Sequence, residues 1–283
     1  MKQIIMNADD FGRHKLINAA VEQGCVSGCL RSATLMPGGV AFEDAIRIAK
    51  AHPELGVGVH LTLVNGNPVL PPEKIPSLVT EEGVFWPDHM TFIKKYFLGQ
   101  IRMSEVKREL AAQMLKVQGT DITISHVDSH QHLHTLPGIM KFVLRLAQEY
   151  GVHAIRIPLT PIKVEAAELN SPMQLIGRAG LAFLAKLAAG KAQQKGFLMP
   201  DHFAGLVAGG AVDTAALLDI CQTLEDGTTE VMLHPGTDNQ TLTRECEWEH
   251  DFEAELGAIT APEVKDALEE QGVIIGNFTT LGA

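Results

Sequence analysis

Apolar stretches of strand length alternate with amphipathic helical stretches along nearly the whole chain. Residues 3–9 (QIIMNAD), 56–63 (GVGVHLTL) and 229–235 (TEVMLHP) have the length and composition of buried strands. This alternation predicts an α/β fold in which helices cover a parallel sheet. Further strands are expected at residues 32–37, 122–128, 154–158 and 273–279, with an eighth candidate at 202–206. Seven or eight parallel strands favour a distorted (β/α) TIM-like barrel over an open sheet.

The chain is long enough to form such a barrel as one unit. It has 283 residues, of which 46% are hydrophobic, and barrels of this class need about 250 residues. The sequence contains no internal repeat, low-complexity tract or linker, so we expect one barrel domain over residues 1–283. A long proline-rich segment at residues 65–87 is expected to form a loop over one end of the barrel.

The charge balance indicates which partners are unsuited to the protein, and the cysteines indicate its cellular compartment. Acidic residues outnumber basic ones by 34 to 23 and no basic cluster is present, which argues against a nucleic-acid partner. The four cysteines form no CxxC pair, as expected for reduced thiols in a cytoplasmic protein. We also expect no export signal and no transmembrane segment, because no apolar run reaches the roughly 20 residues that a span requires.

One apolar helical stretch, at residues 175–196, is rich in small residues and flanked by basic groups. It is expected to be a buried barrel helix or an oligomer interface, which would make the protein a homodimer. Contact with a lipid-linked sugar is the alternative.

Polar side chains follow the apolar part of several predicted strands. They are Asp9, Asp10, His60, Asp128, Arg156 and His234. Each one alone has an ordinary structural explanation, such as a helix cap, a turn or a buried core histidine. Five strands would nevertheless have to place polar groups at the same edge by accident, and burying unpaired charge costs several kcal/mol. The pattern therefore predicts a functional site at the carboxyl edge of the sheet.

Four of the twelve histidines lie within nine residues, HVDSHQHLH at 126–134. Their shared parity with Asp128 would place them all on one side of a continuing strand, and they cannot all bind one ion. Two histidines and one carboxylate with open positions suit a catalytic divalent metal. Spacing alone does not choose among His126, His130 and His132 as the ligand.

Five motifs occur in the order found in one family. They are NADDFG, GVHLTL, HVDSHQHLHTLPG, RIP and LHPG, and they lie between residue 3 and about residue 236. Because it carries these five motifs, the chain resembles the YdjC-like carbohydrate deacetylases. That family includes chitooligosaccharide deacetylases and hopanoid-biosynthesis-associated deacetylases. The segments VLPPEKIPSLV and DHFAGL are more similar to the hopanoid-associated branch.

The resemblance implies a distorted barrel related to polysaccharide deacetylases and one divalent metal ion, Mg²⁺ or Zn²⁺. It implies that Asp10, His60 and His130 bind the metal, that Asp9 is the general base and that His234 is the general acid. The expected reaction is hydrolysis of the N-acetyl group of an amino sugar, in an oligosaccharide or a lipid-linked head group.

Further residues are expected to support this chemistry. Arg156 would keep the general base ionised, and Asp128 would orient a metal-binding histidine. His132 and Phe11 are candidates for substrate contacts or for supporting the metal ligands. The chain departs from the family pattern at Arg13 and the histidine after it, where smaller residues are expected at the mouth of the site.

Two other classes of protein fit parts of the pattern. A metal-dependent phosphoesterase, or another amidohydrolase, usually binds two or three metals and carries His-x-His on its first strand, whereas this first strand ends in Asp9 and Asp10. A non-catalytic sugar-binding relative would present aromatic platforms. Aromatic residues make up only 5% of the chain, and Trp86, Trp248 and Phe11 are the candidates for stacking.

Overall fold

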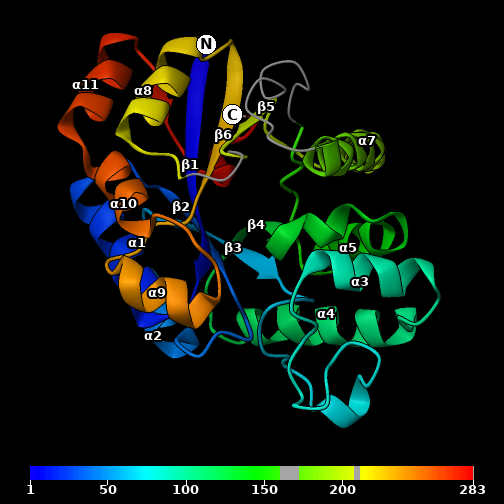
Figure 1. The fold of residues 1–283 in the computed structure, drawn as a ribbon. Coiled ribbons are helices and arrows are strands. Elements are labelled where there is room, and N and C mark those ends of the chain that lie inside the picture. Colours follow the sequence, from blue (N-terminus) through cyan, green and yellow to red (C-terminus); the bar gives the residue numbers. More distant parts are fainter. Residues whose placement is uncertain (160–171, 207–210, 283) are drawn as a thin grey trace.

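The computed structural model describes residues 1–159, 172–206 and 211–282 (Figure 1). A seven-stranded sheet with parallel pairing runs through its centre, in the order β4-β3-β2-β1-β6-β5, and β7 also pairs with β1. The strands are β1 (Lys2–Phe11), β2 (Ser32–Leu35), β3 (Gly56–Leu61), β4 (Ile124–Ser129), β5 (His202–Ala204), β6 (Gly227–Leu233) and β7 (Ile274–Ile275). The predicted parallel α/β architecture is confirmed, and the eighth candidate strand is β5.

Isolated bridges carry the sheet round from β4 to β5. Ile155 bridges to Val127 of β4, and Ala154 bridges to Leu198, a few residues before β5. Residues 154–158 were expected to form a regular strand, and this is wrong, because the segment pairs through single bridges only. The result is a parallel sheet curled into a distorted barrel. Its pairing is irregular between β4 and β5, in the segment that contains Arg156.

Helices flank the sheet in two groups, which lie on opposite sides of the strands in Figure 1. The helices are α1 (Lys15–Ser27), α2 (Phe42–Ala51), α3 (His89–Phe97), α4 (Met103–Gln118), α5 (Pro137–Glu149), α7 (Pro172–Gln194), α8 (Thr214–Thr223), α9 (Asn239–Cys246), α10 (Phe252–Thr260) and α11 (Pro262–Glu270). Aspartate side chains cap the N-termini of α3, α8, α9 and α10 by accepting a backbone N–H, as aspartate does well at this position.

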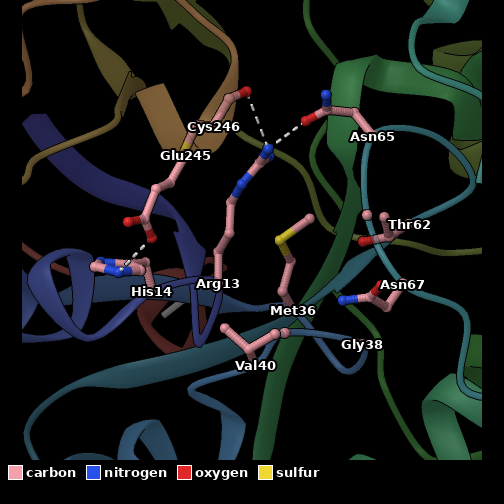
Figure 2. A pocket seen from close by; sticks show the side chains of 12 residues that line it. Arg13, His14, Met36, Gly38, Val40, Thr62, Asn65, Asn67, Glu245 and Cys246 are labelled. Carbon is pink, nitrogen blue, oxygen red and sulfur yellow. Dashed lines mark hydrogen bonds and ion pairs between the residues drawn. The ribbon is translucent and has the colours of Figure 1, made fainter. Parts of the chain in front are cut away.

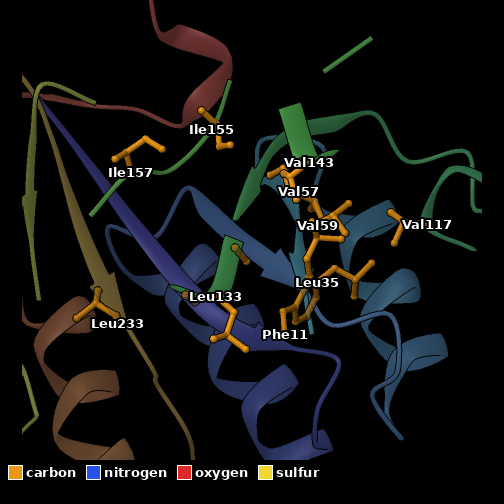
Figure 3. Packing of buried hydrophobic residues seen from close by; sticks show 14 of the residues in the cluster. Phe11, Leu35, Val57, Val59, Val117, Leu133, Val143, Ile155, Ile157 and Leu233 are labelled. Atoms are coloured by element: carbon orange, nitrogen blue, oxygen red, sulfur yellow. The ribbon is translucent and has the colours of Figure 1, made fainter. Parts of the chain in front are cut away.

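Strands β2 and β3 and most of β1 are buried on both faces, as expected for a parallel sheet covered by helices. From Ile4 to Phe11 every residue of β1 is buried, and the core extends to Leu35, Val59 and Leu233 on neighbouring strands (Figure 3). Apolar side chains fill the interior, so polar groups within it stand out and need partners.

The long segment between β3 and α3 is held by a polar stripe on α4. Glu105, Glu109 and Gln113 recur every four residues and are buried, so they lie on one face of the helix. Glu109 accepts hydrogen bonds from two backbone amides of the loop, Glu105 accepts one from Ser77, and Gln113 bonds both the N–H and the carbonyl of Thr62. This segment is the predicted loop of residues 65–87, with one short 3₁₀ turn, Pro72–Lys74.

Helix α7 contains the apolar stretch singled out in the sequence. From residue 179 onward it buries small residues such as Ala185 and Ala188 and exposes Phe183 and Leu187. Among the described residues no helix is long and apolar enough to cross a membrane. The four cysteines are buried and unpaired.

Candidate active site

The end of β1 delivers two consecutive carboxylates to one place. In a regular strand Asp9 and Asp10 would point to opposite faces. Here the pairing with β2 shifts between Ala8 and Phe11, and Asp10 has a positive φ of 62°, which is uncommon for a residue other than glycine. Both carboxylates therefore approach His60, whose Nε2 lies 3.4 Å from Asp10 Oδ1 and 4.0 Å from Asp9 Oδ2.

Asp10, His60 and His130 form a compact group that can hold a metal ion. Asp10 Oδ1 lies 3.0 Å from His130 Nδ1, and the ligand atoms of the three residues all lie within 4.8 Å of one another. All three side chains are buried. His60 comes from β3, and His130 begins the 3₁₀ segment His130–Thr135 directly after β4.

Two observations show that this group fits a divalent cation. His60 Nε2 is buried, lies 3.4 Å from Asp10 Oδ1 and has no hydrogen-bond partner among the described residues. His60 Nδ1 lies 2.8 Å from Asp128 Oδ1, the carboxylate–histidine arrangement that orients metal-binding imidazoles. Two nitrogen donors and one oxygen donor suit Zn²⁺ better than Mg²⁺, which prefers oxygen ligands.

Asp9 is held by Arg156 rather than by the metal-binding group. Arg156 Nη1 and Nη2 donate to Asp9 Oδ2 and Oδ1, both at 2.7 Å, and Asn7 donates to Oδ1 at 2.8 Å. Burial alone would raise the pKa of Asp9, but the positive charge of Arg156, with that of His60, lowers it below the ordinary value. Asp9 is therefore an ionised, oriented carboxylate next to the metal-binding group.

Arg156 binds two further carboxyl groups. Its Nη1 lies 2.7 Å from Asp128 Oδ2 and its Nε donates to Glu230 Oε1 at 2.6 Å. The guanidinium has no exposed surface. Sequence reasoning missed Glu230, although a signal was present: it is the one charged residue of β6 (GTTEVML). It also shares parity with His234, directly after the strand, which predicts that both side chains point to the same side.

His234, directly after β6, lies beside the carboxylate of Asp9. Its Nε2 is 3.9 Å from Asp9 Oδ2. Burial lowers the pKa of His234 below its ordinary value, against the opposing effect of Asp9 and Glu255. The Glu255 carboxylate accepts the backbone N–H of His234, and the ring of Trp248 meets the His234 ring edge-on with centroids 4.9 Å apart.

A cavity of about 270 Å³ is lined by Arg13 and its neighbours but by none of the three metal-binding residues. Figure 2 shows Arg13 within it, reaching the side chain of Asn65 and the carbonyl of Cys246. Arg13 Nη1 also lies 3.4 Å from Asp10 Oδ2 and 3.4 Å from His130 Nε2, so it joins the cavity to the site. The remaining lining residues include His14, Met36, Val40, Thr62 and Asn67, a mixture of polar and apolar groups.

The other residues singled out in the sequence lie behind the site. Phe11 has no exposed surface and packs in the core, which leaves it a packing role and not a substrate contact. His132 is buried with Nδ1 unpaired among the described residues, and burial holds its pKa well below the ordinary value. His126 stacks on Phe278, with centroids 3.5 Å apart, and is not part of the metal-binding group.

Comparison with known proteins places this site in a family. Residues 3–270 match the model of the YdjC-like protein family. A protein of Brevibacillus brevis named carbohydrate deacetylase is 30% identical over 283 residues, covering 99% of this chain and all of the relative. One of Mus musculus with the same name is 30% identical over 292 residues, covering 96% and 92%.

A solved structure agrees with the fold. The crystal structure of a protein of Enterococcus faecalis V583, described as a candidate cellobiose-phosphate cleavage protein, superimposes with a TM-score of 0.75 at 26% identity. It covers 98% of this chain and 97% of its own. The chain therefore belongs to the YdjC-like family, and the resemblance inferred from its five motifs is confirmed.

Proposed function

We propose that this protein is a metal-dependent hydrolase that removes the N-acetyl group from an N-acetylated amino sugar. The observation that carries the proposal is the adjacency of a metal-binding group (Asp10, His60 and His130) and a separate, ionised aspartate, Asp9. The names of the relatives supply the substrate class, since several are called carbohydrate deacetylase.

The chemistry divides between the metal site and Asp9. Asp10, His60 and His130 would hold a divalent ion, which would supply a water of lowered pKa and polarise an acetyl carbonyl. Asp9 accepts the proton of the attacking water, and its pairing with Arg156 keeps it ionised for that task. The products are acetate and the free amine.

His234 is the residue placed to deliver a proton to the leaving amine. Its Nε2 lies 3.9 Å from Asp9 Oδ2, so a small movement of the imidazole would bring the two groups within hydrogen-bond reach. The lowered pKa favours the neutral imidazole before substrate binds, so His234 would gain its proton during the reaction, from the water proton that Asp9 accepts.

The cavity beside Arg13 suits a sugar. Thr62, Asn65 and Asn67 offer hydrogen-bond partners for hydroxyl groups, while Met36 and Val40 offer apolar contact. An oligosaccharide or a lipid-linked head group would both present such a unit. A cytoplasmic location and a homodimer are further parts of the proposal, the latter through the exposed Phe183 and Leu187 of α7.

The test is acetate release from a panel of free, oligomeric and lipid-linked N-acetylhexosamines, followed by mass spectrometry. Metal-free protein should be inactive and should recover activity with Zn²⁺ or another divalent ion. Full turnover by protein shown to be free of metal would contradict the proposed mechanism.

Two outcomes would favour the competing classes. A second bound metal per chain, with activity on phosphate esters, would indicate a phosphoesterase. Two other described groups near His234 could hold an ion, Asp9–His60–Asp128 and His234–His250–Glu255. In the first, Arg156 already pairs with both carboxylates, and in the second both Glu255 oxygens already accept backbone N–H groups. Sugar binding without acetate release across the panel would indicate a non-catalytic relative.

A further inference from the structure

The donors of Arg156 are divided between the reaction site and one group outside it. Its two terminal nitrogens face Asp9 and Asp128. Its Nε points away from them, to Glu230 Oε1 at 2.6 Å. A planar guanidinium with all three nitrogens engaged cannot rotate without breaking one of these contacts.

Glu230 is placed on β6, within the sheet and not on a loop. It pairs in register with Ile5 of β1 and with Phe203 of β5, and it has no exposed surface. The ring of Phe203 also lies 5.7 Å from the guanidinium carbon. The group that holds Arg156 from behind is therefore itself fixed by two neighbouring strands.

We infer that Glu230 is a positioning residue for the hydrolysis: its carboxyl group holds Arg156 by Nε, so that both terminal nitrogens stay directed at Asp9. It touches neither the metal-binding group nor the cavity, and acts on the reaction through Arg156. The inference rests on the proposed function, because it assumes that Asp9 is the base.

Glu230 accepts a hydrogen bond from Arg156 in a site where burial disfavours its charge. Burial raises its pKa to about 8, although Arg156 opposes the rise. Its second oxygen, Oε2, has no hydrogen-bond partner among the described residues, and an unpartnered buried oxygen costs less as a neutral acid than as a carboxylate. Arg156 then carries its positive charge to Asp9 and Asp128 rather than sharing it with a third anion.

The experiment compares Glu230→Gln with Glu230→Met, two side chains of similar length. Glutamine keeps an acceptor oxygen for Nε, and methionine removes it. We expect kcat of Glu230→Gln to stay within about threefold of wild type, and kcat of Glu230→Met to fall roughly 10- to 100-fold, the cost of a small misplacement of a catalytic group. KM and the bound metal per chain should be unchanged in both variants.

Glu105→Met is the matched control. It also removes a buried carboxyl group, one that holds Ser77 in the long loop, so it should lower stability without lowering kcat. If Glu230→Met does not fold, Glu230→Asp replaces it, because its shorter side chain withdraws the acceptor from Nε.

Three results would overturn the inference: wild-type kcat in the folded Glu230→Met or Glu230→Asp variant, an equal loss in Glu230→Gln, or loss of bound metal together with kcat. Failure of the proposed function would look different, because the wild-type protein itself would then release no acetate.

Discussion

Asp9 and Asp10 are neighbours in sequence, and each has an arginine beside it, but the two pairs are built differently. Arg156 is fully buried and grips Asp9 with two hydrogen bonds of 2.7 Å. Arg13 is partly exposed, and one nitrogen lies 3.4 Å from Asp10 while the other bonds Asn65 and Cys246. Asp9 is fixed by its arginine, whereas Arg13 makes only one long contact with Asp10.

The difference matches the task proposed for each carboxylate. A general base must stay ionised and point in one direction, and a saturated, buried arginine provides both. A metal ligand must keep lone pairs free for a cation, and a weak contact at the rim leaves them free. The buried pair is thus part of the frame of the site, and the rim pair is part of its entrance.

The largest effect on activity is expected when each of the two aspartates is mutated on its own. Asp9→Asn should lower kcat by about 10²- to 10⁴-fold, the usual contribution of a general base, while it still binds one metal ion. Asp10→Asn should lose metal affinity together with activity. Acetate-release assays and metal analysis of both variants, with folding checked by circular dichroism, test this; wild-type turnover in Asp9→Asn would remove Asp9 from the mechanism.

The next largest effect compares the arginines. Arg156→Lys keeps the charge but cannot reproduce the fork, so the free energy of unfolding should fall by about 3–5 kcal/mol, as when a buried pair is broken. Arg13→Lys should change it by less than about 1 kcal/mol, because lysine keeps the charge and the contact with Asp10 is long, at 3.4 Å. Urea titrations of both variants decide; equal losses would mean that the pairs are equivalent.

A pH effect should come from the group behind Arg156. The folded-state pKa of Glu230, about 8, lies above the unfolded value of 4.5, so folding favours the protonated acid. Its contribution to stability is full below pH 4.5 and is lost as the pH rises towards 8. Stability should therefore decline less over this range in Glu230→Gln, and parallel profiles in urea titrations would contradict a neutral Glu230.

The smallest effect concerns the metal. Arg13→Gln removes a positive charge near Asp10 and His130, so the divalent ion should bind a few-fold more tightly, in keeping with a partly screened charge. Arg13→Lys should leave the affinity near that of wild type. Titration calorimetry measures both; weaker binding in Arg13→Gln would mean that Arg13 orients the ligands instead of opposing the metal.

The fold followed from the sequence wherever apolar periodicity was strong. Strands β1, β3, β4 and β6 and their neighbouring helices lie close to the predicted ranges. Residues 154–158 have the composition of a strand yet form single bridges, and the strand expected at 273–279 shortens to Ile274–Ile275 followed by a 3₁₀ turn. The composition of a segment predicts that it is buried, but regular strand pairing depends on neighbouring strands that are distant in the sequence.

The sequence predicted which residues form the candidate site, but not how they are arranged in space. The rule that polar groups collect at the carboxyl ends of parallel strands brought Asp9, Asp10, His60 and His234 together. The choice of His130 came from the family resemblance, because spacing cannot report the positive φ of the two residues after it. That rule could not identify Glu230, because this residue lies in the middle of a strand and not at its carboxyl end.

The stripe of Glu105, Glu109 and Gln113 on α4 bears on how this protein can be re-engineered. These three side chains bond mainly the main chain of this segment, so the tip of the loop can change in sequence while its path is kept. A loop grafted from a relative would need its own helix residues to come with it. The path of this loop is thus fixed partly by a helix about forty residues further along the chain.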